Sequence, residues 1–212
     1  NENDMNTMLL KSTELNEFYF IKCPGLARNV VPIYRLRGKV VGLIGFGNIP
    51  RLMAPKAQAF GFDVIACDPY APADIFEKYG VKSVSMDELY EQSDFISVHA
   101  PLLPQTKGLV DIEAFRKMKK TAIIVNTARG PLINETDLIK ALDDNEIGGA
   151  GLDVVETEPL PADSPLIGRD NVILAPHTAF YSVEALEELQ TKAASDVAKV
   201  LIGEEPIYPI KA

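Results

Sequence analysis

The sequence has few of the residues on which disulfide-rich and metal-binding proteins depend. Its 212 residues include two cysteines, two histidines and no tryptophan. Cys23 and Cys67 have neither a metal-binding spacing nor the pattern of a disulfide framework. Cys67 lies within the apolar run DVIACD, where a free cysteine acts as a small buried residue. We therefore expect no metal centre and a reduced, cytoplasmic setting.

Basic residues and long apolar runs are also scarce. The 21 lysines and arginines are outnumbered by 30 aspartates and glutamates, which gives a formal net charge of -9. Because a nucleic-acid surface needs a basic patch, this balance argues against a nucleic-acid partner. No stretch approaches the length of a membrane span, and the start NENDMNTMLL lacks the charged start and apolar run of a signal peptide. We expect no membrane partner.

What is present is an alternation of strand-like and helix-like segments. Ser85 and Glu88 form a capping box, and Asn134 can cap the helix that follows it. Short β-branched runs between the helices are typical of strands buried on both faces of a parallel sheet. The pattern predicts an α/β fold with a doubly wound parallel, Rossmann-like sheet and helices on both faces. The predicted strands are 39–44, 63–67, 94–99, 121–126, 149–155 and 171–176.

The two ends of the chain differ from this central region. Residues 1–36 contain prolines and no clear strand, and we interpret them as an N-terminal arm or linking helix. Residues 37–181 form the predicted dinucleotide-binding domain. Apolar residues at helical spacing predict an amphipathic helix over 182–202, so the segment 182–212 is a helix and a tail.

The segment VVGLIGFGNIP resembles an incomplete GxGxxG dinucleotide fingerprint. Gly45 would permit the tight turn after a strand, and Gly47 would let the backbone approach a pyrophosphate. The amides of Asn48 and Ile49, at the start of the next helix, would then point at the phosphates. Pro50 replaces the third glycine, but in the first helical turn its missing N–H has no intrahelical partner. We expect a slightly reshaped site, although a glycine turn without a ligand stays an alternative.

Asp68 ends the second predicted strand, where a cofactor ribose would lie. A carboxylate there can accept hydrogen bonds from the ribose hydroxyls and would repel a 2′-phosphate. This position therefore favours NAD over NADP. The alternative is a solvated turn, because Asp-Pro in CDPY is common in turns.

Polar side chains also follow the later strands. Arg129 has the fork of donors that suits a substrate carboxylate. His177 could move a proton near neutral pH, and Glu158 could orient its ring. With a nicotinamide cofactor to carry a hydride, these parts would oxidise a 2-hydroxy acid or reduce a 2-keto acid. The alternative for Arg129 is a surface arginine in a turn, and the alternative for His99 is a structural role.

A family resemblance rests on six segments in order: YRLRGKVVGLIGFG, VIACDPY, SVHAPLLPQT, IIVNTARGPLIN, GLDVVETEPLP and NVILAPHTAFYS. They are similar to successive blocks of the D-isomer-specific 2-hydroxyacid dehydrogenases, and the resemblance covers residues 33–205. It implies that Arg129, Glu158 and His177 are the catalytic arginine, glutamate and histidine. It implies a homodimer that uses NAD and a small substrate of the D-3-phosphoglycerate, glyoxylate/hydroxypyruvate or D-lactate class.

The resemblance also extends the predicted cofactor site. It implies that the loop from Ala100 to Thr106 follows the adenosine, and that Thr127, Ala128 and Asp153 surround the nicotinamide carboxamide. The complete predicted set is Gly45, Gly47, Asn48, Ile49, Asp68, His99, Ala100, Pro101, Thr106, Thr127, Ala128, Arg129, Asp153, His177, Ala179 and Phe180.

The chain departs from the family pattern at Pro50 and in its length, and one segment is similar to a particular branch of the family. Family members open with a separate substrate domain, which the arm is too short to hold, so we expect either a piece of a longer enzyme or a chain without turnover. Phe180 in PHTAFYS is similar to the C-terminal-binding-protein branch. Phe180 would line the substrate pocket or pack under the final helix. The alternative function is an NAD-binding sensor or scaffold domain of that type without efficient turnover.

Overall fold

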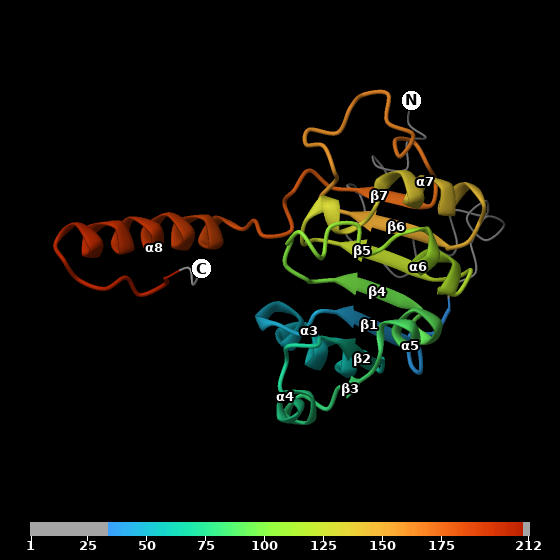
Figure 1. Ribbon diagram of the computed structural model, residues 1–212, viewed down its shortest axis with the longest axis horizontal. Helices are drawn as coiled ribbons and strands as arrows, with labels where there is room; N and C mark the ends of the chain where they lie inside the picture. Colours follow the sequence, from blue (N-terminus) through green and yellow to red (C-terminus); the bar gives the residue numbers. More distant parts are fainter. Residues whose placement is uncertain (1–33, 210–212) are drawn as a thin grey trace, which may run out of the picture. The chain divides into compact units, whose positions relative to one another are not determined.

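The computed structural model describes residues 34–209 (Figure 1). The chain divides into two units, Asn1–Arg35 and Leu36–Ala212, and the fold below is that of the second unit. The predictions for Cys23 and for nearly all of the arm lie outside the described residues.

Seven parallel strands form one sheet, in the order β3-β2-β1-β4-β5-β6-β7 (Figure 1). The six predicted strands are confirmed. β3 was missed because its two polar residues carry no apolar run. The strand bounds are β1 Val40–Ile44, β2 Asp63–Cys67, β3 Lys82–Ser83, β4 Phe95–Val98, β5 Ile123–Asn126, β6 Gly149–Leu152 and β7 Val172–Leu174.

Six α-helices and one 3₁₀ turn connect or follow these strands within the described residues. The capping box of Ser85 and Glu88 starts α5, and the Asn134 side chain caps α7 by accepting from the Asp137 amide. Both predicted caps are confirmed. The bounds are α3 Asn48–Ala59, α4 Ala73–Lys78, α5 Met86–Gln92, α6 Ile112–Lys117, η2 Gly130–Leu132, α7 Glu135–Asp143 and α8 Val183–Leu201.

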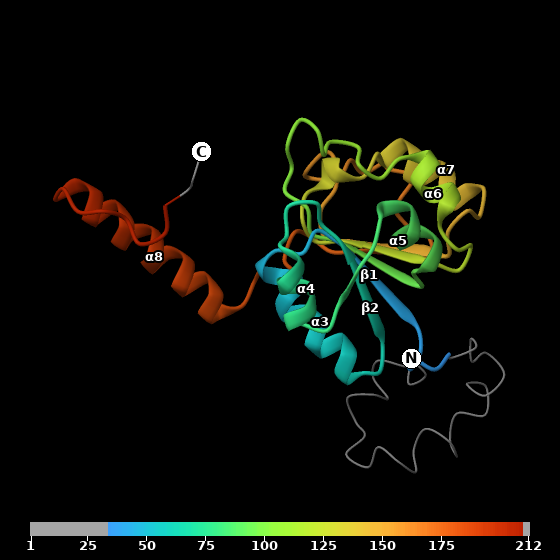
Figure 2. The same cartoon turned by 60° about the horizontal axis from the view of Figure 1, so that its bottom comes forward.

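The core consists of two apolar clusters on opposite faces of the sheet. Val41 and Leu43 of β1 belong to the cluster that packs under α3 and α4. Ile44 belongs to the other, which packs against α5, α6 and α7. Successive side chains of a strand point to opposite faces, so a buried strand needs cover on both. Figure 2 shows β1 and β2 between α3 and α4 on one side and α5 on the other. The doubly wound fold is confirmed.

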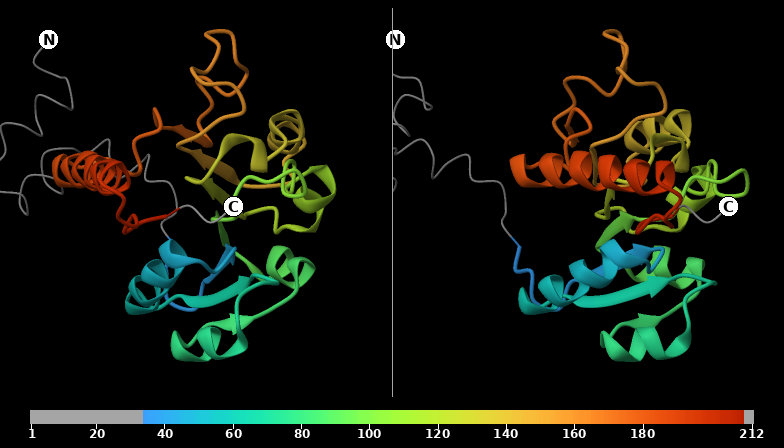
Figure 3. Two further views of the ribbon diagram at one scale, coloured as in Figure 1. Left: turned by 60° about the vertical axis from the view of Figure 1, so that its left-hand side comes forward. Right: turned by 90° about the vertical axis from the view of Figure 1, so that its left-hand side faces the viewer.

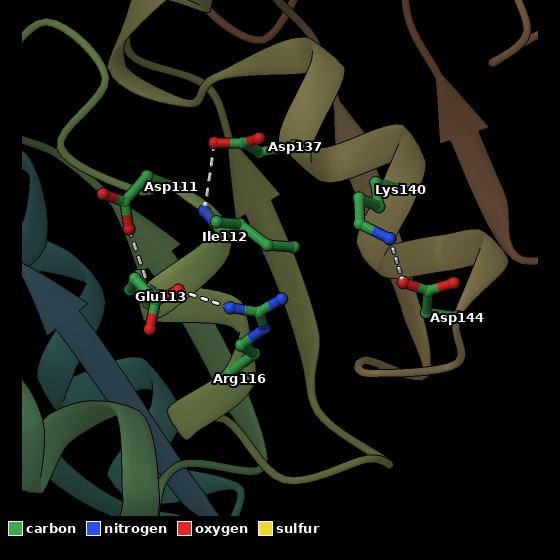
Figure 4. Close-up of polar contacts among 8 residues, drawn as sticks. Asp111, Ile112, Glu113, Arg116, Asp137, Lys140 and Asp144 are labelled. Carbon is green, nitrogen blue, oxygen red and sulfur yellow. Dashed lines mark hydrogen bonds and ion pairs between the residues drawn. The ribbon is translucent and has the colours of Figure 1, made fainter.

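The segment that follows η2 is held beside the start of α6. The amide of Val110 donates to the carbonyl of Leu132 at 3.0 Å, and the amide of Asn134 donates to the carbonyl of Val110 at 2.9 Å. In addition, an Asp137 carboxylate oxygen accepts from the Ile112 amide at 3.1 Å (Figure 4). These bonds anchor the chain on the C-terminal side of η2.

The predicted amphipathic helix is α8, which begins after the N-cap Ser182. The tail after it turns back along the helix (Figures 1 and 3), and the Asp196 carboxylate accepts from the amides of Ile207 and Tyr208. No α8 side chain is buried. None of the helices within residues 34–209 has the length and apolarity needed to cross a membrane.

Candidate active site

The turn between β1 and α3 is built on Gly45. Its φ is +90°, and a Cβ atom there would lie 3.1 Å from both the Ala100 amide nitrogen and the His99 carbonyl carbon. Glycine alone adopts this conformation without strain and leaves room for the neighbouring strand end. The amide of Gly45 donates to the carbonyl of Cys67 at 2.8 Å. The ends of β1, β2 and β4 therefore meet at this turn.

The N-terminus of α3 is open to a ligand. Gly47 is the N-cap and provides no side-chain cap, and a Cβ atom there would meet nothing within 4 Å. The exposed residues Asn48 and Ile49 begin the helix. Pro50 is buried in the first turn, and the first helical amide bond runs from Arg51 to the Gly47 carbonyl at 3.2 Å. The proline therefore costs α3 no hydrogen bond, and this end of the helix suits an anion.

Asp68 lies beside this helix end and holds the turn together. One carboxylate oxygen accepts from the Phe46 amide at 2.8 Å, and the other accepts from the Tyr70 amide at 2.9 Å. Each oxygen has a further lone pair for a ribose hydroxyl. Asp68 is thus both a structural residue and a candidate ribose ligand.

An apolar pocket of about 540 Å³ opens next to Asp68. Its loop wall is fixed by Thr106, whose hydroxyl accepts from the Leu103 amide and donates to the Pro101 carbonyl, both at 2.7 Å. Cys67 is half-buried in the wall, where burial and then the nearby Asp68 raise the pKa of its thiol. An anion site, a carboxylate and an apolar pocket in a row fit the phosphate, ribose and adenine of a dinucleotide. The lining residues include Gly45, Tyr70, Met86, Ala100, Leu103 and Leu109.

His99 points into the protein. Its Nε2 lies 2.9 Å from the hydroxyl of the buried Ser97, and burial lowers the pKa of His99 to about 4. A histidine that stays neutral near pH 7 is a poor proton donor there. The geometry therefore favours the structural alternative for this residue.

His99 should make folding stability depend on pH. Its pKa is about 4 in the folded chain and 6.5 ordinarily, so the unfolded chain binds more protons between these values. Stability present above pH 6.5 is then lost as pH falls through 4, by up to roughly 3 kcal/mol. Urea unfolding of wild type and His99→Asn near neutral pH and at about pH 4.5 measures this. We expect a smaller loss in the variant, and equal losses would contradict the assignment.

His177 and Glu158 form a pair at the carboxyl edge of β6 and β7. The imidazole Nδ1 lies 2.7 Å from a Glu158 carboxylate oxygen, and both side chains are partly exposed. The hydrogen bond from His177 lowers the pKa of Glu158, and a bond from the Val155 amide adds to this. Glu158 therefore holds one ring nitrogen and leaves Nε2 for another group.

The backbone at His177 is held in an unusual conformation by Asp153. His177 has a φ of +55°, and its amide donates to the Asp153 carbonyl at 2.8 Å. The Asp153 carboxylate is 7% exposed and accepts from the amides of Thr178 and Ala179 at 2.7 and 2.9 Å. The family resemblance placed Asp153 near the carboxamide and gave no hint of this role. The sequence indicates such a role only through the place of Asp153 in the apolar run GLDVV, because a buried carboxylate needs hydrogen-bond donors.

Arg129 follows β5 at the same edge of the sheet and is exposed. Within the described residues its guanidinium donates to the carbonyl of its neighbour Ala128 at 2.6 Å. Thr127 beside it is exposed as well. Gly130 leaves no room for a side chain, because a Cβ atom would lie 1.9 Å from the Val155 carbonyl oxygen. The loop that carries Arg129 therefore packs directly on the loop that leads to Glu158.

Phe180 lies near the His177 ring. The two ring centroids are 6.1 Å apart at an interplanar angle of 88°, and Phe180 is 55% exposed. Tyr181 is equally exposed. Neither ring is buried under a helix, so the geometry favours the first of the two predicted roles for Phe180, a place beside the reacting groups.

The comparisons with known proteins agree with this geometry. Residues 14–179 match the family model described as "D-isomer specific 2-hydroxyacid dehydrogenase, NAD binding domain". The chain belongs to this family. The predicted resemblance is thereby confirmed, and with it NAD as the cofactor of the domain.

Among its relatives is "Hydroxypyruvate reductase" of Blautia hydrogenotrophica, 43% identical over 81% of this chain and 53% of the relative. "D-3-phosphoglycerate dehydrogenase" of Methanocaldococcus jannaschii is 45% identical over 80% of this chain and 32% of the relative. The solved D-lactate dehydrogenase with NAD+ from Lactobacillus jensenii has a TM-score of 0.76 and 30% identity, over 84% of this chain and 57% of that one. The chain thus spans between 32% and 57% of the length of these three relatives.

Proposed function

We propose that this chain is the NAD-binding and proton-transferring part of an oxidoreductase that moves a hydride between NAD and a small D-2-hydroxy acid or its 2-keto partner. The observation that carries the proposal is the His177–Glu158 pair at 2.7 Å on the edge of the sheet where the dinucleotide turn lies. Similarity to hydroxypyruvate, phosphoglycerate and D-lactate enzymes supports substrates of these three classes.

The residues present fit the cofactor from its adenosine to its nicotinamide end. The α3 amides would hold the pyrophosphate, Asp68 would bind the ribose, and the apolar pocket would take the adenine. Bound NAD supplies the acceptor or donor of the hydride. The nicotinamide end would lie beside the strand-end loops of β5, β6 and β7, which carry Thr127, Ala128 and Phe180.

The chain's own residues would manage the substrate and the proton. The exposed Arg129 guanidinium would bind the substrate carboxylate through two donors. His177 Nε2 would take the proton of the hydroxyl during oxidation and return one to the carbonyl oxygen during reduction. Glu158 would hold Nδ1 and stabilise the ring in the protonated step.

Turnover with a panel of 2-keto acids tests the proposal. The chain is mixed with NADH and glyoxylate, hydroxypyruvate, pyruvate or 3-phosphohydroxypyruvate, and NADH absorbance is followed. Consumption of NADH with one of them supports the enzyme. Binding of NADH without consumption would favour the sensor or scaffold alternative.

The homodimer and the cytoplasmic location stay predictions. Light scattering tests whether the chain forms a homodimer.

Asp68 should set the preference for NADH over NADPH. Asp68→Asn keeps one oxygen for a backbone amide but removes the charge, so we expect NADH to bind about tenfold more weakly and the NADH-to-NADPH affinity ratio to fall. Asp74→Asn, in the exposed first turn of α4, removes the same charge as a control and should leave the ratio unchanged. An unaltered ratio in Asp68→Asn would rule out a ribose ligand at this position.

A further inference from the structure

We infer that Asn126 is the residue that positions Arg129 for the substrate carboxylate, an inference that rests on the proposed function. Asn126 is the last residue of β5 and is 1% exposed. It does not reach the surface on which Arg129 lies, so it acts through the backbone between them.

Both ends of the Asn126 side-chain amide are bonded to the Arg129 loop. Its Oδ1 accepts from the Ala128 amide at 3.0 Å, and its Nδ2 donates to the Arg129 carbonyl at 2.9 Å. These two bonds close the turn after β5. They fix the peptide group that precedes Ala128 and the one that follows Arg129. The Ala128 carbonyl, in turn, accepts from the guanidinium at 2.6 Å.

Asparagine satisfies both hydrogen bonds at this position. The Ala128 amide needs an acceptor and the Arg129 carbonyl needs a donor, and the asparagine side chain carries one of each. Aspartate would place a charged oxygen against the Arg129 carbonyl, and alanine would leave both groups without a partner. The length of the side chain matters as well, because Nδ2 must reach a carbonyl three residues along the chain.

The other side of Arg129 is fixed independently. Gly130 packs against the Val155 carbonyl, and η2 is bonded to the segment before α6. Among these contacts, those of Asn126 are made by a side chain, so a substitution can remove them. Its backbone carbonyl also accepts from the Asp153 amide at 3.0 Å. Because Asp153 holds the His177 turn, Asn126 links the groups that would bind the carboxylate and move the proton.

Binding of oxamate, a non-reducible analogue of a 2-keto acid, tests this role. Calorimetry of the full chain with saturating NADH is compared for wild type, Asn126→Ala and Asn126→Asp. We expect both variants to bind oxamate about tenfold more weakly or worse, because a displaced Arg129 loses its alignment with the carboxylate. NADH affinity should stay within about threefold, because the groups that would bind its pyrophosphate, ribose and adenine lie at the β1–α3 turn, at Asp68 and in the apolar pocket, and are unaltered.

Asn134→Ala is the matched control. Asn134 lies at the far end of the same segment, and its side chain also accepts from a backbone amide, at 3.1 Å. Its loss should lower thermal stability comparably but leave oxamate binding intact. Unchanged oxamate binding in Asn126→Ala, or an equal loss in Asn134→Ala, would overturn the inference.

A second readout separates this inference from the proposed function. Hydrogen exchange of the Ala128 amide, followed by NMR, reports the bond to Asn126 without any ligand. It should become at least about tenfold faster in Asn126→Ala and stay unchanged in Asn134→Ala. If wild type failed to bind oxamate, the proposed function would fail. An unchanged exchange rate in Asn126→Ala would independently refute the positioning role.

Discussion

Replacing His177 by asparagine is expected to lower the rate of NADH-dependent keto-acid reduction about 10³-fold. The imidazole is the group whose free Nε2 would deliver the proton, since Glu158 holds Nδ1 at 2.7 Å. Asparagine tolerates the φ of +55° at this position, so the backbone should keep its conformation. NADH affinity should change by less than about threefold, because no cofactor-binding group on α3 or β2 is altered.

His99→Asn provides the matched control for this prediction. It removes the chain's other histidine, whose Nε2 lies 2.9 Å from the hydroxyl of the buried Ser97. Stability should fall in this variant while turnover changes little. Similar rates in wild type and His177→Asn would remove His177 from the chemistry, and a parallel loss of NADH affinity would make its role structural.

Gly130→Ala should destabilise the fold by roughly 3 kcal/mol or more. The added Cβ atom would lie 1.9 Å from the Val155 carbonyl oxygen and 2.7 Å from the Glu156 amide nitrogen. Both are backbone atoms, so relief requires the two loops to separate. Because the Val155 amide donates to Glu158 at 3.2 Å, the same movement should disturb the histidine–glutamate pair. Urea unfolding gives the loss of stability.

Gly151→Ala is the control, because it replaces a glycine by alanine where the added Cβ atom causes no clash. Gly151 lies within β6, and a Cβ atom there would approach Val125 no closer than 3.6 Å, an ordinary contact. We expect the variant to be within about 1 kcal/mol of wild type. Equal stabilities of Gly130→Ala and wild type would show that the loops of Arg129 and Glu158 do not pack as described.

The sequence predicted the sheet well because its strands are apolar runs that only a doubly covered parallel sheet can bury. It missed β3, which has the polar residues Lys82 and Ser83, and it extended the strand of β6 through Val155. The strand ends at Leu152, and the Asp153 carboxylate that follows accepts from the amides of Thr178 and Ala179 in the turn after β7. Such a contact joins residues 25 positions apart, and no local pattern reports it.

In the candidate site, too, some residues could be predicted from the local sequence and others depend on contacts that only the fold creates. Gly45, Asp68 and His177 could be found because each follows a predicted strand and carries chemistry of its own. Asn126 could not, since an asparagine at a strand end has many uses. Its role depends on being buried with both ends of its amide bonded to one turn. Likewise, the sequence offered two roles for His99, and the bond to Ser97 distinguishes them.

Calorimetric titration of the chain with NADH and, in parallel, NADPH is the most direct test of the central claim, that the β1–α3 turn binds NAD although Pro50 replaces the third glycine. Heat is the suitable signal because the chain has no tryptophan to report on a bound nicotinamide. The open end of α3 and the Asp68 carboxylate predict binding of NADH with a clear preference over NADPH. No binding of either, or equal affinity for both, would contradict the account.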